Sequence, residues 1–220
     1  MSRLPAHKQV RSRGFSLMEV VCALAILSVG VMSAAALAGK MLSTGRQSKY
    51  MSLASTLASE KLEDLNHYSP NDPQVCVPSA STSVGSLSSD VMQSTTCPPS
   101  VTWSTGFTGT VAYYDNVSIS LSTSSSDCPN PTAGCFSETV SGLSGGSPSY
   151  TTTYHSPDGQ IVTPAASTTA PTNVTFHRRW SIEANANAPV AGTRRVTVLV
   201  TLMDTTVQPS VNFQMSLVRP

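Results

Sequence analysis

Charged residues are scarce in this chain, and the few present are unevenly distributed. Only 11% of the 220 residues are Asp, Glu, Lys or Arg, and the formal net charge is +1. Residues 1–14 contain four Lys and Arg and no acid, so the rest of the chain has nine basic residues against twelve acidic ones, a formal charge of −3. A body with this balance has no general electrostatic attraction for nucleic acid or anionic lipid.

Patterns typical of metal sites and catalytic centres are also missing. His67, His155 and His177 are far apart in sequence, and the cysteines have no tight C-x-x-C spacing. Residues 142–146, GLSGG, match the G-x-S-x-G nucleophile motif. They lie in a Ser/Gly-rich stretch, which offers neither the strand nor the helix that this motif requires. We therefore expect no enzymatic activity, no metal and no cofactor.

Proline is absent between Phe15 and Ser69, and the sequence there predicts one long helix from about Phe15 to about Asn66. In residues 15–39, Glu19 is the only charged side chain, and the run is long enough to cross a bilayer. Cys22, within this run, is expected to pack as a small apolar residue. Because basic residues stay on the cytoplasmic side of a membrane, the basic stretch in residues 1–14 predicts that the C-terminal body lies outside.

The second half of the predicted helix is apolar on one side only. Its apolar residues recur at steps of three or four: Tyr50, Ala54, Leu57, Ala58, Leu62 and Leu65. In residues 173–220, apolar and polar side chains alternate in three runs, which predicts a three-stranded antiparallel sheet. The apolar members are Val174, Phe176, Trp180 and Ile182, then Val196, Val198, Val200 and Leu202, then Val211, Phe213, Met215 and Leu217. The predicted fold class is therefore α+β, with a long N-terminal helix packed on a C-terminal antiparallel sheet.

Between the helix and this sheet, residues 67–172 are rich in Ser, Thr, Pro and Gly, which predicts long surface loops. Inside this region, residues 109–122 predict a short hairpin that turns at Asp115-Asn116. The region also holds four cysteines, an even number that suggests two disulfides in an exported domain: Cys76, Cys97, Cys128 and Cys135. Of the three connectivities we favour Cys128–Cys135, which closes a short loop, and then Cys76–Cys97.

Four arginines of the predicted sheet form a candidate basic patch: Arg178, Arg179, Arg194 and Arg195. If the first two strands form a hairpin that turns near residues 187–189, Arg179 and Arg195 become diagonal neighbours on its polar face. Such a patch would offer a contact to a partner or to nucleic acid. The alternative is plain solvation of a strand edge, which also discourages aggregation.

The junction RSRGFSLMEV, residues 11–20, joins the basic leader to the apolar run through Gly14 and Phe15, with Glu19 four residues further on. A carboxylate in hydrocarbon costs at least about 2.5–3.5 kcal/mol, so Glu19 needs either a partner or access to the lipid headgroups. This junction resembles the type III signal sequence of type IV prepilins and of type II secretion pseudopilins. The resemblance implies cleavage after Gly14 by prepilin peptidase and N-methylation of Phe15. It also implies that Glu19 pairs with the new amine of a neighbouring subunit and so sets the register of a filament.

The later segments ASTLASEKLEDL and HRRW are similar to those of PilV-type minor pilins. The lack of proline in the apolar half of the helix and the large Ser/Thr-rich region also favour a minor subunit. The resemblance divides the chain into a cleaved leader (1–14), a membrane and filament-core half-helix (15–38), an amphipathic half-helix (39–66), a loop region (67–172) and a sheet (173–220). It implies a precursor in the bacterial inner membrane with a cytoplasmic N-terminus, and a mature subunit in a cell-surface pilus or periplasmic pseudopilus.

Three other interpretations stay open at this point. A minor pseudopilin of a type II secretion system would use the same N-terminal chemistry. A secreted soluble binding protein would use a conventional signal peptide, with A-x-A-like sites at residues 34–36 or 36–38, although the helical pattern continues past both. A single-pass membrane enzyme is disfavoured because no credible catalytic cluster accompanies the apolar run.

Overall fold

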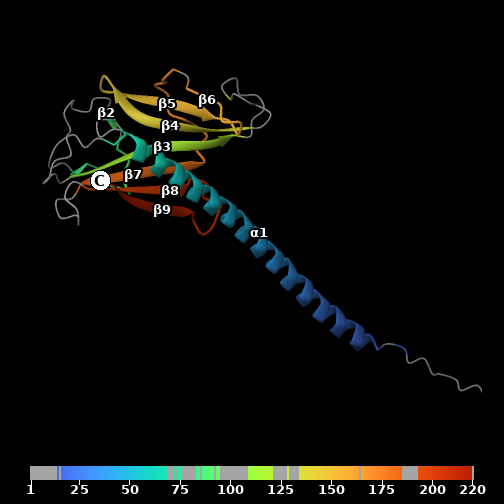
Figure 1. Cartoon of the computed structure of the whole chain (residues 1–220). Helices are drawn as coiled ribbons and strands as arrows, with labels where there is room; N and C mark the ends of the chain where they lie inside the picture. The colour runs from blue at the N-terminus through green and yellow to red at the C-terminus, as the bar shows by residue number, and fades with distance from the viewer. Residues whose placement is uncertain are drawn as a thin grey trace, which may run out of the picture. The chain divides into compact units, whose positions relative to one another are not determined.

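The structure is a computed structural model of the whole chain (Figure 1). It describes residues 14, 16–68, 72, 74–75, 83–84, 86–91, 93–94, 109–120, 128, 134–163, 165–184 and 193–219. The chain divides into two compact units, residues 1–45 and residues 46–220. They are called the N-terminal unit and the C-terminal unit below, and each is described by itself.

Helix α1 spans Leu17–His67 and confirms the long N-terminal helix that the absence of proline predicts. It begins after Ser16, whose carbonyl oxygen accepts hydrogen bonds from the backbone N–H groups of Glu19 (3.0 Å) and Val20 (3.3 Å). Every residue of α1 that belongs to the N-terminal unit is exposed. The buried residues of the helix all belong to the C-terminal unit.

The C-terminal unit contains one sheet whose main strands lie in the order β6–β5–β4–β3–β7–β8–β9, with every neighbouring pair antiparallel (Figure 1). Two short strands, β1 and β2, pair in parallel with β3 and β4. The bounds are β1 Ser83–Val84, β2 Gln93–Ser94, β3 Gly109–Ser120, β4 Cys135–Ser144, β5 Ser147–His155, β6 Ile161–Val162, β7 Phe176–Ala184, β8 Arg194–Leu202 and β9 Asn212–Arg219.

Strands β7, β8 and β9 confirm the predicted C-terminal meander. Phe176 lies opposite Leu202, and Val198 lies opposite both Trp180 and Met215. The alternating pattern correctly identified the inward face, because side chains two positions apart on a strand share one face of the sheet.

The region predicted as loops contains strands β3, β4 and β5. Strand β3 runs through Asp115 and Asn116 without a turn, so the hairpin predicted there is wrong. Asp115 is fully buried on the same face as Tyr113 and Val117, and it has charged partners there. Local polarity therefore indicated a turn at a position where tertiary contacts stabilise a strand.

A true hairpin connects β4 to β5, and its turn is Gly145-Gly146. Both glycines have a positive φ, 58° and 82°, which suits the two-residue turns that match the twist of antiparallel strands. Two consecutive glycines between strands are a known hairpin signal. Here the Ser/Gly-rich surroundings obscured that signal, and the composition predicted a loop instead.

One face of the sheet is covered by the part of α1 that lies in the C-terminal unit. The apolar stripe predicted from the sequence is buried there: Ala54, Leu57, Ala58, Leu62 and Leu65. These residues form a single core with Phe176 and Trp180 of β7, and the ring of Tyr50 meets the ring of Phe176 edge-on with centroids 6.2 Å apart. The predicted α+β arrangement of a long helix on an antiparallel sheet is confirmed.

Candidate functional site

Gly14 lies just before the first turn of α1 and is exposed. A Cβ atom added at this position would meet no described atom within 4 Å. Packing therefore does not explain why a glycine stands here. A requirement imposed from outside the chain, such as recognition by a peptidase, would explain it. Phe15, the other half of the predicted cleavage site, lies outside the described residues.

Glu19 is in the first turn of α1 and is exposed. A carboxylate at this end of a helix is favourable, because the unpaired N–H groups of the first turn carry partial positive charge. It is also the only charged side chain in residues 16–39. Residues 16–39 thus present a single acid on an otherwise uncharged surface.

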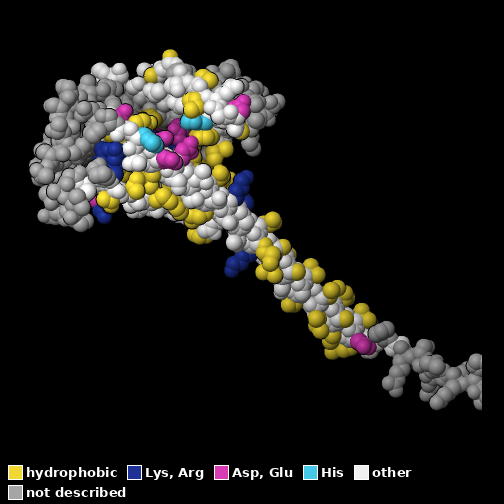
Figure 2. Space-filling model, in the orientation of Figure 1, with side chains coloured by type: hydrophobic (Ala, Val, Ile, Leu, Met, Phe, Trp, Pro, Cys, Tyr) yellow, Lys and Arg dark blue, Asp and Glu magenta, His cyan; other side chains and the backbone are white. Residues whose placement is uncertain are grey.

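Exposed apolar side chains follow Glu19 along α1, and Figure 2 shows them on the side of the helix in view. Large apolar side chains from Leu17 to Leu42 are 47–82% exposed, for example Leu24 (59%) and Met32 (73%). Among the described residues, α1 is the one helix that is long and apolar enough to cross a membrane. Cys22 is a free, exposed cysteine on the same segment. Such a surface needs lipid or other apolar helices around it.

Residues 10–35 match the family model of the prokaryotic N-terminal methylation motif.

The matched segment contains Gly14 and Glu19 and the first part of the exposed apolar helix. The match supports the type IV pilin-like family, whose members are substrates of prepilin peptidase, and it points to a structural subunit rather than an enzyme. No curated protein and no solved structure matches the chain. The methylation motif and the exposed apolar helix also fit anchoring in a membrane before assembly.

A second notable site lies in the C-terminal unit, where a cluster of four charged residues is buried beneath α1. Arg178 of β7 is fully buried and lies directly opposite Asp115 of β3. Its Nε and Nη2 donate hydrogen bonds to the two carboxylate oxygens of Asp115 at 2.8 and 2.7 Å. Nη2 also donates to Glu138 of β4 at 2.7 Å, and Nη1 donates to the carbonyl oxygen of Leu57 on α1 at 3.3 Å. One guanidinium group thereby links three strands to the helix.

Lys61 completes the cluster from the helix side. Only 2% of the residue is exposed, and its Nζ lies 3.0 Å from Asp115 Oδ2. The same Nζ donates to the side-chain oxygen of Gln74 at 2.8 Å and lies 4.4 Å from the ring centroid of Trp180. The ammonium group is therefore compensated by a carboxylate, an amide and an aromatic face.

The protonation of this cluster is controlled by its own charges. Burial alone would lower the pKa of Arg178, but the carboxylates of Asp115 and Glu138 outweigh that effect and hold the pKa above its ordinary value. Burial would likewise raise the pKa of Glu138, but neighbouring His155, Arg178 and Lys61 hold it well below its ordinary value of 4.5. His155 Nε2 lies 3.7 Å from Glu138, which is an electrostatic contact rather than a hydrogen bond. Glu138 therefore stays ionised at neutral pH.

This cluster was not predicted from the sequence, where Arg178 was grouped with Arg179, Arg194 and Arg195 as a candidate basic patch. The structure does not bring these four arginines together on one face of the sheet. Arg178 and Arg194 are buried, whereas Arg179 and Arg195 follow them on the opposite face of their strands. Arg195 lies opposite Glu183, not near Arg179, which lies opposite Leu199. Arg195 forms an ion pair with Glu183, and Arg179 forms one with Asp90 at 2.7 Å.

A signal for the cluster was present in the pattern. Lys61 stands four residues after Leu57 and four before Leu65, on the buried stripe of the helix. Arg178 stands between Phe176 and Trp180, and Asp115 between Tyr113 and Val117, each on the buried face of its strand. Buried charges are stable only when they are paired, so one charged residue at an inward position on each of three elements predicts that these residues contact one another.

Two other residues considered for a metal or catalytic site, His177 and Ser144, are not part of such a site among the described residues. His177 is held between Asn116 (2.7 Å) and Asp90 (2.8 Å) on the sheet face that α1 does not cover. Ser144, the serine of the G-x-S-x-G match, is an exposed residue at the end of β4 beside the Gly145-Gly146 turn. Within the described residues, no group of three or more His, Cys, Asp or Glu side chains is arranged to hold a metal ion.

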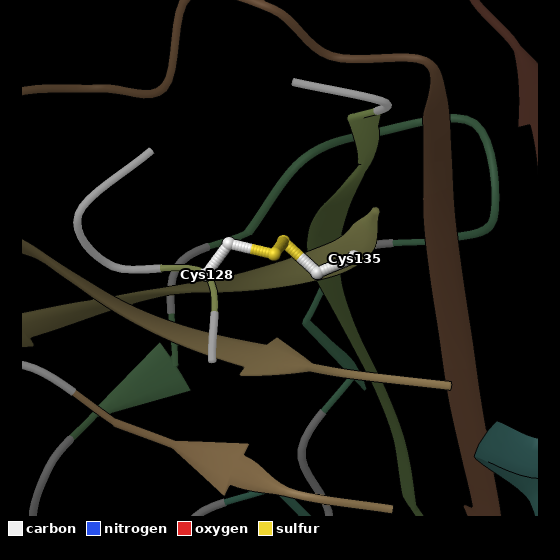
Figure 3. The surroundings of a disulfide bond; sticks show 2 residues. All are labelled: Cys128 and Cys135. Carbon is white, nitrogen blue, oxygen red and sulfur yellow. A yellow bond between two sulfur atoms is a disulfide. The ribbon is translucent and has the colours of Figure 1, made fainter. Parts of the chain in front are cut away.

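Cys128 and Cys135 form a disulfide, as the short loop between them predicts (Figure 3). Their Cα atoms are 6.0 Å apart, within the usual range for a disulfide, and Cys135 is the first residue of β4. The bond therefore ties the preceding chain to the start of this strand. Cys76 and Cys97 lie outside the described residues, and their pairing stays a prediction.

Proposed function

We propose that this chain is a minor subunit of a type IV pilus, inserted in the inner membrane as a precursor and cut between Gly14 and Phe15. The observation that carries the proposal is the methylation motif over residues 10–35, which contains Gly14, Glu19 and the first part of an exposed apolar helix. The glycine has no packing role, and residues 17–45 of the helix have no partner for their apolar surface among the described residues. A peptidase and other filament subunits would supply the missing partners.

The assembly step is proposed to depend on Glu19 and the new amine of Phe15. After cleavage the amine is a positive charge at the end of an apolar helix, and Glu19 is the only negative charge near it in sequence. Each charge is costly in an apolar surrounding, and a contact between the Glu19 of one subunit and the amine of the next would compensate both. Such a contact would favour one axial register over the others, as buried polar pairs do in coiled coils.

Mass spectrometry of the N-terminus of the mature protein tests the proposal. We expect a chain that starts with N-methylated Phe15. A start near Gly39 would instead indicate a conventional signal peptide, and an intact leader in cells that contain the peptidase would contradict the proposal. Recovery in sheared surface filaments, rather than in the periplasm only, would separate a pilus subunit from a pseudopilin.

The register role is tested separately with Glu19→Ala. This change leaves Gly14 and Phe15 in place, so we expect normal cleavage but a lower amount of the subunit in purified filaments. Glu63→Ala, on the exposed side of the same helix, is the control. Normal incorporation of the Glu19 variant would contradict the register role without affecting the cleavage proposal.

A further inference from the structure

A groove with a volume of about 300 Å³ opens between α1 and the β4–β5 side of the sheet, entirely within the C-terminal unit. Leu53, Leu57 and Glu60 line it from the helix. Phe136 lines it from β4, and His155 and Pro157 line it from the end of β5. Apart from Glu60 and His155, these side chains are apolar, so the groove suits an apolar occupant with a limited number of polar groups.

The walls of the groove are built from fixed elements. The ring of His155 stacks flat on the ring of Phe136, with centroids 4.5 Å apart and an angle of 4° between the planes. Cys135 also lines the groove and is held by its disulfide to Cys128. A groove formed by a helix, two paired strands and a disulfide exists before anything binds, which lowers the entropic cost of binding.

In the described part of the chain, one carboxylate in the groove and one beside it lack an ion-pair partner. Glu60 lines the groove, and Asp64 follows one turn later on α1; both are half-buried. Burial raises the pKa of each carboxyl, and the negative charge of Glu138 adds to the increase. The positive charges of Arg178 and His155, and of Lys61 in the case of Asp64, lower the pKa by less than burial raises it. Among the described residues, neither carboxylate has a Lys, Arg or His within ion-pair distance. Figure 2 shows acidic side chains gathered beside histidines on this face of the unit.

This arrangement has a cost in the free subunit. A half-buried carboxylate without a partner disfavours the folded state, because water solvates the ion better than the protein does. The nearby cations Lys61 and Arg178 are already bound to Asp115 and Glu138. Residues kept at such a cost are expected to serve an interaction outside the chain.

The chemistry of that interaction follows from the groove. A partner segment with a cation next to apolar side chains would suit both features. Its cation would neutralise Glu60 and Asp64, and its apolar side chains would fill the groove. The chain itself carries a segment of this kind: between Glu19 and Glu60 there is no acid, but Lys40, Arg46 and Lys49 are present. Met41 and Leu42, next to Lys40, are 65% and 73% exposed. Anionic lipid and nucleic acid would be repelled by the same carboxylates.

We propose that the groove between Leu53–Glu60 and the β4–β5 end is a docking site for the basic, apolar-flanked helical segment of a neighbouring filament subunit, of the kind that residues 40–49 form here. The proposal rests on the proposed function, because it needs parallel helices in an assembly. Residues 40–49 and residues 53–60 are displaced by about twelve positions, roughly 18 Å along a helix. The contact would therefore involve a different neighbour from the one that meets Glu19, which is four positions from Phe15.

The first test is photo-crosslinking in assembled filaments of the full chain. A photoreactive residue replaces Thr56, which is exposed and lines the groove, and a matched probe replaces Glu63, which is exposed on the same helix but does not line it. We expect the Thr56 probe to give a product whose partner peptide is a helical segment of another subunit with Lys or Arg beside apolar residues. Equal products from both probes, or a partner peptide without basic residues, would overturn the proposal.

The second test compares assembly with stability. We expect the double variant Glu60→Gln/Asp64→Asn to fall about tenfold in filament incorporation, equivalent to about 1.4 kcal/mol. Its unfolding midpoint at neutral pH should stay the same or rise, because two poorly solvated charges are removed. Glu63→Gln should change neither quantity. Normal incorporation of the double variant, or a loss that follows a lower midpoint, contradicts docking.

A control on the N-terminus separates the two proposals. Each variant is examined by mass spectrometry for cleavage after Gly14. A double variant that is cut correctly yet incorporated normally overturns the groove proposal alone. A chain that is never cut, in the variants and in the unchanged protein alike, overturns the proposed function and the groove proposal with it.

Discussion

The two parts of helix α1 use their residues in opposite ways. In residues 17–45, apolar side chains are exposed and the single acid in the first half stands on the surface. In residues 46–67, the inward face carries a buried lysine among leucines and alanines. Among the described residues, the apolar side chains of the first part have no partners, whereas Lys61 in the second part has its charged partner, Asp115, within the C-terminal unit. The first part therefore needs an apolar environment from outside the chain, and the second contributes to the core of its own unit.

The buried charges restrict the position of α1 along the sheet, which the apolar stripe alone does not. Apolar contact is non-directional, so a helix could slide along a sheet with little change in buried area. Arg178 bonds to Asp115, Glu138 and the Leu57 carbonyl at once, and Lys61 bonds to Asp115 from the helix. These contacts are all made in one position of the helix on the sheet. The cluster therefore fixes the alignment of α1 on the sheet.

The largest expected effect comes from a change before the helix, where nothing in the fold depends on the residue. In Gly14→Leu the added side chain meets no described atom, so the C-terminal unit should unfold at the same denaturant concentration as before. Cleavage, however, should be lost almost completely, and only the precursor should accumulate. Immunoblots and N-terminal mass spectrometry measure this. Efficient cleavage of the variant would show that the glycine has no role in processing.

The next effect is expected at the centre of the charge cluster. Arg178→Met keeps much of the side-chain volume but leaves Asp115 and Glu138 buried with less compensation, which should cost on the order of 3–5 kcal/mol in unfolding free energy. Denaturant unfolding of the full chain in detergent measures it. Adding Asp115→Asn should recover part of the loss, because one uncompensated charge is removed.

A matched surface pair provides the control for that experiment. Arg195 is exposed and forms its ion pair with Glu183 near solvent, so Arg195→Met should cost less than about 1 kcal/mol. A similar loss in the two variants would mean that burial does not distinguish the cluster from an ordinary surface pair.

Removal of the disulfide is expected to have an intermediate effect. Cys128 and Cys135 are seven positions apart, and a loop of this length should contribute roughly 2–3 kcal/mol through the entropy of the unfolded chain. Cys128→Ser/Cys135→Ser should lower the unfolding free energy by that amount in oxidising buffer. The unchanged protein in reducing buffer should show at least as large a decrease, because the predicted Cys76–Cys97 bond would be reduced as well. If the variant is as stable as the parent, the disulfide is not needed to hold the first residue of β4 in the sheet.

The smallest effect is a change in the pH dependence of stability. The pKa of Glu138 is lower in the folded than in the unfolded chain, so its ion pairs stabilise the fold above about pH 4.5 and are lost as the pH falls below that value. Glu138→Gln should be less stable than the parent at pH 7, and the difference should shrink toward pH 3. Glu60 and Asp64 have raised pKa values and act in the opposite direction, so their stabilising contribution is present at low pH and lost as the pH rises. A difference that stays constant with pH would contradict the role of Glu138.

Local patterns predicted much of the fold but not all of its strands. Alternation identified β7, β8 and β9, because Val, Phe and Trp at every second position leave little choice of face. The same rule failed for β3, where Asp115-Asn116 indicated a turn, and for β4–β5, where Ser and Thr dominate both strands. In these strands the neighbours across the sheet stabilise the extended backbone, and the residues themselves carry a weak signal.

Local sequence patterns were enough to predict the N-terminal motif, the long helix with its apolar and amphipathic parts, the C-terminal meander and the Cys128–Cys135 bond. Each of these features depends on residues close together in the chain. Which charges are buried depends instead on contacts between strands and helix that form on folding. Asp115 and Arg178 are 63 positions apart, and their pairing follows from the register of β3 on β7, which no local pattern encodes. The groove and its unpaired carboxylates arise in the same way, from helix and sheet residues that meet only after folding.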